Sequence, residues 1–215
     1  MTHAVQFVSG IDTDAGKTVA AGWLARRRMD AGLAVATVKP VQTGAEGFSP
    51  DLAVHRRLMG IGRLPEDLSG DTHPQTFRYP ASPHLAASLE GRTVDVEACT
   101  RAVYRVAAAY DLTLVEGAGG LMVPLAKELL AIDWAAREGW PVVFVASGKL
   151  GAINHALLSF EAMASRGMTL AVLIWNEGAA GLDPVIERDA FDVVTRAARC
   201  AWPDAEVLRL PKLDL

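Results

Sequence analysis

The sequence has few of the residues that mark several large classes of protein. Its two cysteines, Cys99 and Cys200, lie far apart and lack metal-ligand spacing, which favours reduced thiols in a cytosolic protein over a disulfide framework. No apolar run approaches the roughly 18 residues that a membrane-spanning helix needs. The N-terminus lacks the charged start and long apolar core of a signal peptide. We therefore expect a cytoplasmic protein with no membrane segment.

An excess of positive charge is also missing. Lysine and arginine total 21 against 25 aspartates and glutamates, a net charge of −4. A nucleic-acid-binding domain usually carries a broad basic footprint, so we expect no nucleic-acid partner. The length of 215 residues, of which 51% are hydrophobic, suits one domain, 1–215, with a substantial core.

Lysine is scarce, because sixteen of the 21 basic residues are arginine. Arginine evidently supplies ordinary surface charge, so a lysine more often serves where a compact ammonium is needed. Lys17, Lys39 and Lys149 each lie beside glycine or proline at an expected strand end. Lys127 has no such setting and is interpreted as a surface residue.

Short apolar runs alternate with longer helical stretches along the chain. The runs are dense in Val, Leu and Ala, as in strands buried on both faces, and the alternation predicts an α/β fold with a mostly parallel central sheet flanked by helices on both faces. The expected strands are Ala4–Ser9, Ala34–Val38, Leu112–Glu116, Pro141–Ala146, Leu170–Trp175 and Glu206–Leu210. The expected helices are Lys17–Asp30, Asp51–Met59, Pro83–Leu89, Val94–Tyr110, Ile132–Glu138, Ile153–Arg166 and Pro184–Ala198.

The segment Gly10–Thr18 reads Gly-Ile-Asp-Thr-Asp-Ala-Gly-Lys-Thr. It joins a strand to a helix, where successive backbone N–H groups can bind phosphate. Lys17 would neutralise phosphate charge and Thr18 would offer a hydroxyl to Mg²⁺. Five residues separate Gly10 from Gly16, whereas the standard P-loop has four. A glycine-rich turn that binds nothing is the alternative, but the flanking elements favour a nucleoside triphosphate site.

Three more charged side chains accompany this loop. Glu116 ends an apolar strand, where P-loop proteins commonly place a carboxylate for Mg²⁺, although an exposed loop glutamate is the alternative. Lys39 precedes a proline, so it extends from a strand end and could hold a γ-phosphate or an acyl oxyanion, unless it is a surface lysine. Asp51 begins an expected helix and is either its N-cap or a second carboxylate for Mg²⁺. Ligands bind at the carboxyl ends of parallel strands, so Lys39 and Glu116 should face one crevice.

Other segments leave two interpretations open. The helix start at 151–154 could bind a carboxylate through free N–H groups, or could be a plain capped helix. Ser82 is typical of an N-cap ahead of Pro83. Asn176 could contact a nucleobase edge or could be a turn residue. The stretch 60–80, rich in Gly, Pro, Asp and Thr, predicts a functional or mobile loop.

Together these motifs resemble the dethiobiotin synthetase family of the biotin pathway. They run in the family's order across nearly the whole chain, and as a set they are highly specific. The matching segments are Gly10–Thr18 with its five-residue gap, Lys39–Gly44, Ser82–His84, Val115–Gly120 with the following Pro124–Leu125, Lys149–His155, and Asn176.

The resemblance implies a P-loop NTPase-like fold and an ATP- and Mg²⁺-dependent ligase. The substrates would be ATP, CO₂ or bicarbonate, and 7,8-diaminononanoate. CO₂ would enter as a carbamate, which ATP converts to a carbamic–phosphoric anhydride before the second amine closes a cyclic urea. In the family the helix start at 151–154 binds the substrate carboxylate across a dimer interface, so a homodimer is implied.

The resemblance also implies roles for individual residues. The catalytic residues would be Lys39, Lys17 and Thr13, with Lys39 stabilising the carbamate and the transferring phosphoryl group. Substrate would contact Thr13, Lys39, Thr43, Ser82, Gly151, Ala152, Ile153 and Asn154. Mg²⁺ would be held by Thr18, Asp51 and Glu116. ATP would contact Asp14, Ala15, Gly16, Lys17, Thr18, Val19, Asp51, Glu116, Gly117, Ala118, Gly119, Asn176, Glu177, Pro211, Lys212 and Leu213.

The chain departs from the family pattern at a few positions. Asp14 stands where some members have Glu, and Thr43 where Ser is common. The sequence ends at Leu215, soon after Lys212, whereas family members often continue further. We therefore expect a partly open adenine pocket, and a preference for ATP rather than strict selectivity.

Two rival functions are disfavoured by the sequence. P-loop switch or partitioning ATPases carry a signature lysine five residues before the P-loop lysine, where this chain has Asp12. Amide-forming synthetases that act on corrinoids usually carry a glutaminase domain with a nucleophilic cysteine. The chain has no room for such a domain, and neither cysteine lies in a nucleophile-elbow context.

Overall fold

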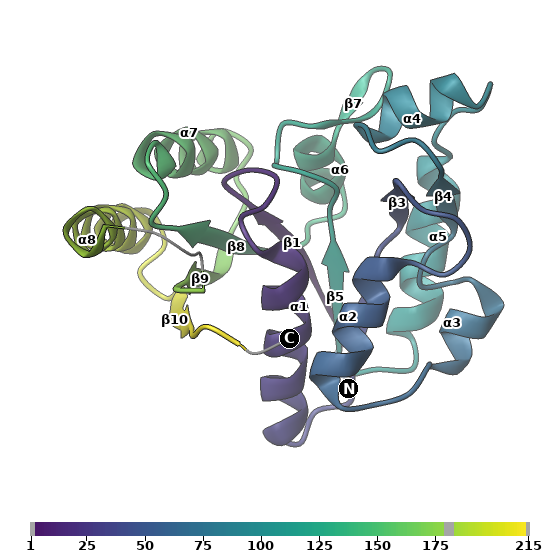
Figure 1. Ribbon diagram of the computed structural model, residues 1–215, viewed down its shortest axis with the longest axis horizontal. Coiled ribbons are helices and arrows are strands. Elements are labelled where there is room, and N and C mark those ends of the chain that lie inside the picture. Colours follow the sequence, from purple (N-terminus) through teal and green to yellow (C-terminus); the bar gives the residue numbers. More distant parts are fainter. Residues whose placement is uncertain (1–2, 179–182, 214–215) are drawn as a thin grey trace.

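A six-stranded parallel sheet forms the centre of the computed structural model, which describes residues 3–178 and 183–213. The strand order is β10-β9-β8-β1-β5-β2, and every neighbouring pair runs parallel (Figure 1). The six predicted strands are confirmed to within one residue at each end. They are β1 (Ala4–Gly10), β2 (Val35–Val38), β5 (Leu112–Glu116), β8 (Val142–Ser147), β9 (Leu170–Asn176) and β10 (Glu206–Leu210).

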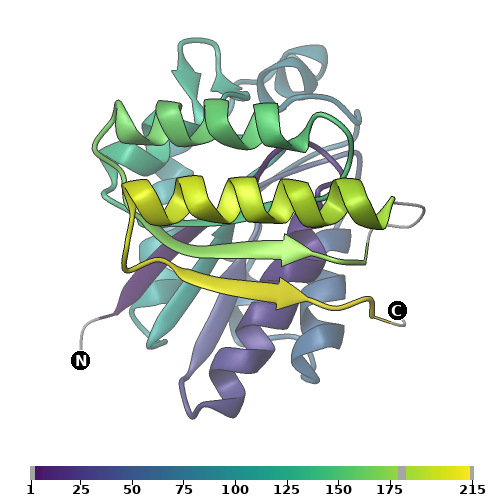
Figure 2. The same cartoon turned by 90° about the vertical axis from the view of Figure 1, so that its left-hand side faces the viewer.

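Successive side chains of the central strands alternate between two hydrophobic cores, one on each face of the sheet. Phe7 and Phe144 pack toward one face of the sheet, whereas Val8 and Val143 pack toward the other. Helices α1 (Lys17–Asp30) and α2 (Pro50–Met59) cover the second face. The first face carries α4 (Pro83–Leu89), α5 (Val96–Ala107), α6 (Ala131–Arg137), α7 (Ala152–Ala164) and α8 (Pro184–Ala201). Figure 2 shows α7 and α8 lying side by side over the β9–β10 edge. The predicted α/β fold is confirmed.

The start of α2 decides one open question from the sequence. Ser49 is the N-cap, and its side chain accepts a hydrogen bond from the backbone of Leu52. Pro50 takes the first helical position, where a backbone N–H would have no acceptor within the helix. Asp51 therefore does not cap the helix, and its carboxylate is free for other contacts.

The short elements were not predicted. Strands β3 (Val41–Thr43) and β4 (Gln75–Phe77) form a small parallel pair, and β6 (Pro124–Ala126) and β7 (Leu129–Leu130) form a hairpin. Segments of two or three residues are too short to show a periodic pattern.

The stretch 60–80 is also more ordered than the predicted loop. It holds the short helix α3 (Pro65–Ser69) and β4, and Asp67, Thr72 and Phe77 are buried. The stretch therefore holds regular elements in place of an irregular loop, supported by buried polar side chains and by the pairing of β4 with β3, and its mobility or function stays a prediction.

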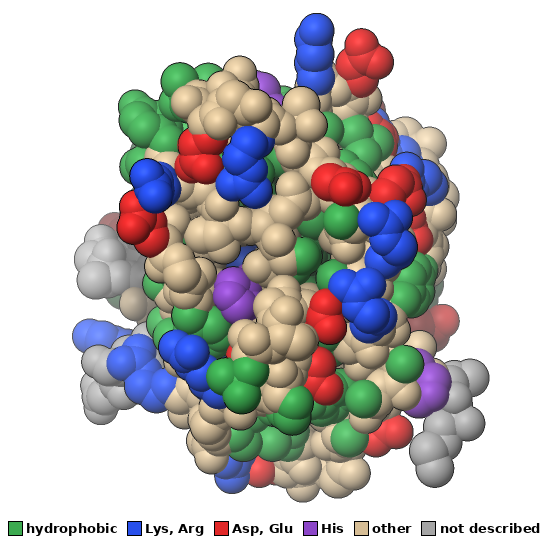
Figure 3. All heavy atoms as spheres, turned by 90° about the vertical axis from the view of Figure 1, so that its right-hand side faces the viewer, with side chains coloured by type: hydrophobic (Ala, Val, Ile, Leu, Met, Phe, Trp, Pro, Cys, Tyr) green, Lys and Arg blue, Asp and Glu red, His purple; other side chains and the backbone are tan. Residues whose placement is uncertain are grey.

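The surface carries mixed charge. On the face in Figure 3, lysine and arginine side chains lie among aspartates and glutamates. Among the described helices, none is both long and apolar enough to cross a membrane.

Candidate functional site

The loop between β1 and α1 has the backbone of an anion-binding turn. Asp14 and Gly16 both take positive φ angles, 59° and 92°, and Gly16 leads directly into α1. Positive φ is favourable for glycine, and residues in this conformation within a turn are typical of an anion-binding nest of N–H groups. The Lys17 Nζ donates to the backbone oxygen of Asp12 at 2.6 Å. Burial lowers the pKa of Lys17 to about 8, partly offset by the charge of Glu116.

Lys39, at the end of β2, lies at the centre of a buried charged cluster. Its Nζ lies 2.8 Å from Asp51 Oδ2 and 2.9 Å from Glu116 Oε1, and it also donates to the backbone oxygen of Gly117 at 3.0 Å. Thr18 Oγ1 donates to the same Glu116 oxygen at 2.9 Å. Lys39 is 5% exposed, so the alternative of a surface lysine is wrong. Glu116 is 2% exposed, which excludes the exposed loop glutamate.

The charges in this cluster stabilise one another. Burial favours the neutral form of Glu116, but Lys39 and His55 outweigh it and hold the pKa of that carboxyl well below its usual range. Burial likewise opposes the charge of Lys39, yet Glu116 and Asp51 raise the pKa of its ammonium. Lys39 and Glu116 therefore stabilise each other's charged form.

The oxygen atoms of this cluster suit a hard divalent cation. Thr18 and Glu116 meet in one hydrogen bond, and Glu116 and Asp51 already share the ammonium of Lys39. Hydroxyl and carboxylate oxygens are typical Mg²⁺ ligands, with phosphate oxygens and water completing the shell. Within the described residues no cluster of three or more His, Cys, Asp or Glu side chains could hold a metal alone. The donor set thus fits a cation that arrives with a phosphate ligand.

Two cavities meet at this cluster. The smaller, about 240 Å³, is lined by the phosphate loop from Thr13 to Val19, except the buried Ala15, together with Lys39, Asp51, Glu116 and Gly119. The larger, about 500 Å³, extends away toward β3, α4 and the loop after β5. Both have Thr13, Lys39, Asp51 and Gly119 in their walls. A group bound in one cavity would therefore lie next to a group bound in the other.

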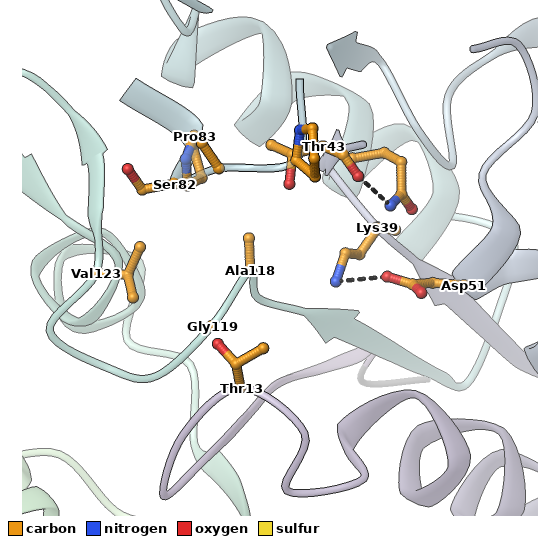
Figure 4. Close-up of a pocket in the computed structure, with 12 residues that line it drawn as sticks. Thr13, Lys39, Thr43, Asp51, Ser82, Pro83, Ala118, Gly119 and Val123 are labelled. Atoms are coloured by element: carbon orange, nitrogen blue, oxygen red, sulfur yellow. Dashed lines mark hydrogen bonds and ion pairs between the residues drawn. The ribbon is translucent and has the colours of Figure 1, made fainter. Parts of the chain in front are cut away.

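The larger cavity gathers predicted substrate residues from three separate segments. Thr13 lies across the space from Ser82, and Lys39 and Thr43 line the side near α2 (Figure 4). Ser82 occupies the N-cap position of α4, but its side chain makes no capping hydrogen bond. Ala81, Pro83, Ala118 and Val123 give the cavity apolar walls. The arrangement suits a ligand with a hydrocarbon chain and a polar end near Lys39.

The predicted adenine residues lie on the opposite side of the phosphate loop. Asn176 Nδ2 donates to the backbone oxygen of Ala15 at 3.1 Å, and a Cβ atom on Gly16 would come within 2.3 Å of that nitrogen. The Asn176 Oδ1 accepts from Gly178 N at 2.9 Å, and a Cβ atom on Gly178 would lie 3.5 Å from Lys212 Cα. Glu177 pairs instead with Arg209 at 2.6 Å. The phosphate loop, Asn176 and 211–213 are thus contiguous, and their contact with adenine stays a prediction.

The helix start at 151–154 does not join either cavity. Gly151 is the N-cap of α7, with φ of 89° and no side-chain cap, and the residues that follow are absent from both cavity walls. The connection to the site is indirect, since Lys149 Nζ donates to Asp12 Oδ2 at 3.0 Å.

Three residues near the site are not singled out by the sequence pattern. Gln42 lines the larger cavity. Asp12 joins the phosphate loop to Lys149. His55 is fully buried, and its Nε2 lies 2.8 Å from Glu116 Oε2. The spacing of four between Asp51 and His55 places both on one helix face, which is the signal that could have identified His55.

Comparisons with known proteins give two levels of similarity. A family model described as an AAA domain matches residues 5–199. In fold, the chain is similar to MinD in the MinC:MinD cell division complex of Aquifex aeolicus (TM-score 0.57, 14% identity, covering 98% of this chain and 82% of the other). It is also similar to a ParA family ATPase from Chlorobium tepidum (TM-score 0.58, 14% identity, 99% and 86% covered). At this identity the likeness shows the P-loop NTPase-like fold alone.

Curated relatives give the closer match. The chain is 49% identical to the ATP-dependent dethiobiotin synthetase BioD of Chlorobaculum tepidum, over 82% of this chain and 74% of that protein. It is 46% identical to the ATP-dependent dethiobiotin synthetase BioD 2 of Haemophilus influenzae, over 80% and 90%. The chain therefore belongs to the ATP-dependent dethiobiotin synthetase family.

Proposed function

We propose that this enzyme carboxylates 7,8-diaminononanoate and closes it to dethiobiotin, consuming ATP and releasing ADP and phosphate. The supporting observation is that the phosphate-loop cavity and the larger, partly apolar cavity share Lys39, Thr13 and Asp51. A nucleotide γ-phosphate in the first would adjoin a carbamate in the second, as phosphoryl transfer between them requires.

The first step forms a carbamate. One substrate amine attacks CO₂, a C–N bond forms, and a proton is released to solvent. The hydroxyl groups of Thr13 and Thr43 would orient the amine and the carbamate from opposite walls of the cavity. The ammonium of Lys39 would balance the new negative charge. Its burial makes that balance stronger than it would be in water.

The second and third steps transfer phosphate and close the ring. A carbamate oxygen attacks the γ-phosphorus, the bond to the bridging oxygen breaks, and ADP leaves. The second amine then attacks the carbonyl carbon and expels phosphate, giving the cyclic urea. Lys17 and the loop N–H groups would hold the phosphates, while Lys39 would stay beside the transferred group.

We further propose that Thr18, Asp51 and Glu116 hold Mg²⁺ with the nucleotide. Mg²⁺ would neutralise charge that develops on the phosphate oxygens. Asn176 and 211–213 would hold adenine, giving a preference for ATP. Equal turnover of GTP or CTP at subsaturating concentration would argue against that preference.

A homodimer is also proposed. The N–H groups at the start of α7 would bind the substrate carboxylate of a neighbouring subunit. This part of the proposal is supported by their position outside the cavity walls of their own chain. We place the assembled enzyme in the cytoplasm.

Replacement of Asp51 tests its place in the metal site. Asp51→Asn keeps the shape but removes the charge that pairs with Lys39 at 2.8 Å. We expect the Mg²⁺ concentration for half-maximal activity to rise about tenfold or more, because the loss of a group that merely orients a metal ligand already costs about 10- to 100-fold in affinity. A magnesium titration at fixed ATP measures this. An unchanged titration curve would remove Asp51 from the metal site.

The overall proposal is tested by ADP release from purified protein with Mg²⁺-ATP and bicarbonate. We expect release to depend on added diaminononanoate. ADP release at the same rate without the diamine would instead support the switch or partitioning type of ATPase.

A further inference from the structure

We propose that His55 is a positioning residue that fixes the orientation of the Glu116 carboxylate toward the metal. The inference rests on the proposed function, since it assigns Glu116 to metal binding. It concerns a side chain that lines neither cavity and that the motifs of the chain do not include.

The two oxygen atoms of Glu116 have different partners. Oε1 accepts from Thr18 and from Lys39, both at 2.9 Å, and so faces the phosphate loop. Oε2 lies on the other side, 2.8 Å from His55 Nε2. A carboxylate held at one oxygen can rotate about its terminal bond, whereas one held at both cannot. His55 therefore fixes the plane of the carboxylate, so that one oxygen is directed toward the phosphate cavity.

His55 is itself held in one orientation. Its Nδ1 lies 2.9 Å from Thr37 Oγ1 on β2, and Arg56 Nη1 donates to that same oxygen at 2.7 Å. A carboxylate only accepts, so the Nε2 nitrogen must carry a hydrogen. Thr37 already accepts from Arg56 and can donate its own hydrogen to Nδ1. Arg56, Thr37, His55 and Glu116 thus form a row of hydrogen-bonded side chains. Every donor in this row has an acceptor.

The far end of the row is anchored by an ion pair. Arg56 donates from Nε and Nη2 to the two oxygens of Asp67, at 2.7 and 2.6 Å. Asp67 also accepts from Thr72 Oγ1 at 2.8 Å. The side chains of His55, Arg56 and Asp67 are all buried, so water does not compete for these contacts. From Asp67 on α3 the row passes to Arg56 on α2 and Thr37 on β2. It then returns to α2 at His55 and ends at Glu116 in the site.

Hydrogen bonds to metal-ligating groups orient the ligand, and their loss typically weakens metal affinity about 10- to 100-fold. His55→Leu removes the donor and replaces the imidazole with an apolar side chain of similar size. His55→Gln keeps an N–H donor at a similar reach. We expect Mn²⁺, used as a probe with ADP, to bind His55→Leu at least about tenfold more weakly, and His55→Gln within about threefold of wild type.

The measurement is Mn²⁺ titration followed by electron paramagnetic resonance, with circular dichroism to confirm folding. His3→Leu serves as a histidine control, because His3 is exposed and contacts the backbone oxygen of Tyr110 away from the row, and it should bind Mn²⁺ as wild type does. If His55→Leu fails to fold, Thr37→Val removes the hydroxyl that orients His55 and should weaken Mn²⁺ binding in the same direction.

Two outcomes overturn the proposal. One is a folded His55→Leu variant with Mn²⁺ affinity within twofold of wild type. The other is equal weakening in the Leu and Gln variants, which would mean a packing role. The titration contains no diamine, so it is independent of the reaction. If wild type binds Mn²⁺ but releases no ADP with the diamine, the proposed function fails while the positioning role is still tested.

Discussion

Lys39→Gln is expected to lower kcat by about 10²-fold or more, the loss seen when one preorganised donor to developing charge is removed. Lys39 Nζ is buried and lies within 3.0 Å of three oxygen acceptors, so its position is fixed before substrate binds. Glutamine keeps hydrogen-bonding capacity but carries no charge. In the proposed reaction, both the carbamate and the transferred phosphoryl group would gain negative charge beside this position. The loss should therefore appear in kcat rather than in the KM for ATP.

Steady-state kinetics with varied ATP and varied diamine measure the effect. Lys127→Gln is the matched control, because Lys127 is exposed as the sequence predicts and should leave kcat unchanged. A Lys39→Gln enzyme with normal kcat and a raised KM for ATP would make Lys39 a ground-state binder instead.

Asp67→Asn should destabilise the fold by about 3–5 kcal/mol, because it leaves the guanidinium of Arg56 buried without a counter-charge. The side chains of Arg56 and Asp67 are 5% and 0% exposed. Domains of this size have a free energy of unfolding of about 5–15 kcal/mol, so the loss is a large share of the total. Urea unfolding followed by circular dichroism measures it.

Asp71→Asn provides the control, because Asp71 pairs with Arg105 at the surface and such pairs contribute less than about 1 kcal/mol. A loss of similar size in both variants would contradict the assignment of stability to the buried pair.

The same carboxylate gives the fold a pH dependence. Burial favours the neutral form of Asp67, but its bonds to Arg56, Leu64 and Thr72 outweigh it and hold its pKa below the ordinary 3.8. Stability from this group is therefore complete above about pH 4 and is lost as the pH falls through the lowered pKa. Asp67→Asn should show a weaker loss of stability on acidification than wild type.

Structural features that depend on residues close together in the sequence could be predicted from it. The phosphate loop and the strands are of this kind, because the pattern of apolar runs fixes which residues end each strand. The carboxyl ends of parallel strands then meet at one edge, which is why Lys39 and Glu116 could be placed together. The role of Asp51 stayed open, since only the structure shows that Ser49 takes the cap.

Individual contacts between distant segments could not be predicted. The spacing from Asp51 places His55 on the same face of α2, but its partner is known only from the structure, where β5 brings Glu116 to it. The Arg56–Asp67 pair depends on a short helix inside a stretch that reads as a loop. The helix start at 151–154 lies outside the cavities of its own chain, so its proposed role depends on a second subunit.

The most direct test of the account is product analysis with isotopically labelled bicarbonate. Purified enzyme, Mg²⁺-ATP and diaminononanoate should yield dethiobiotin whose ureido carbon carries the label, with one ADP formed for each ring closed. Unlabelled product, or ADP formed without any cyclic urea, would contradict the claim that the two cavities joined at Lys39 carry out carboxylation and ring closure.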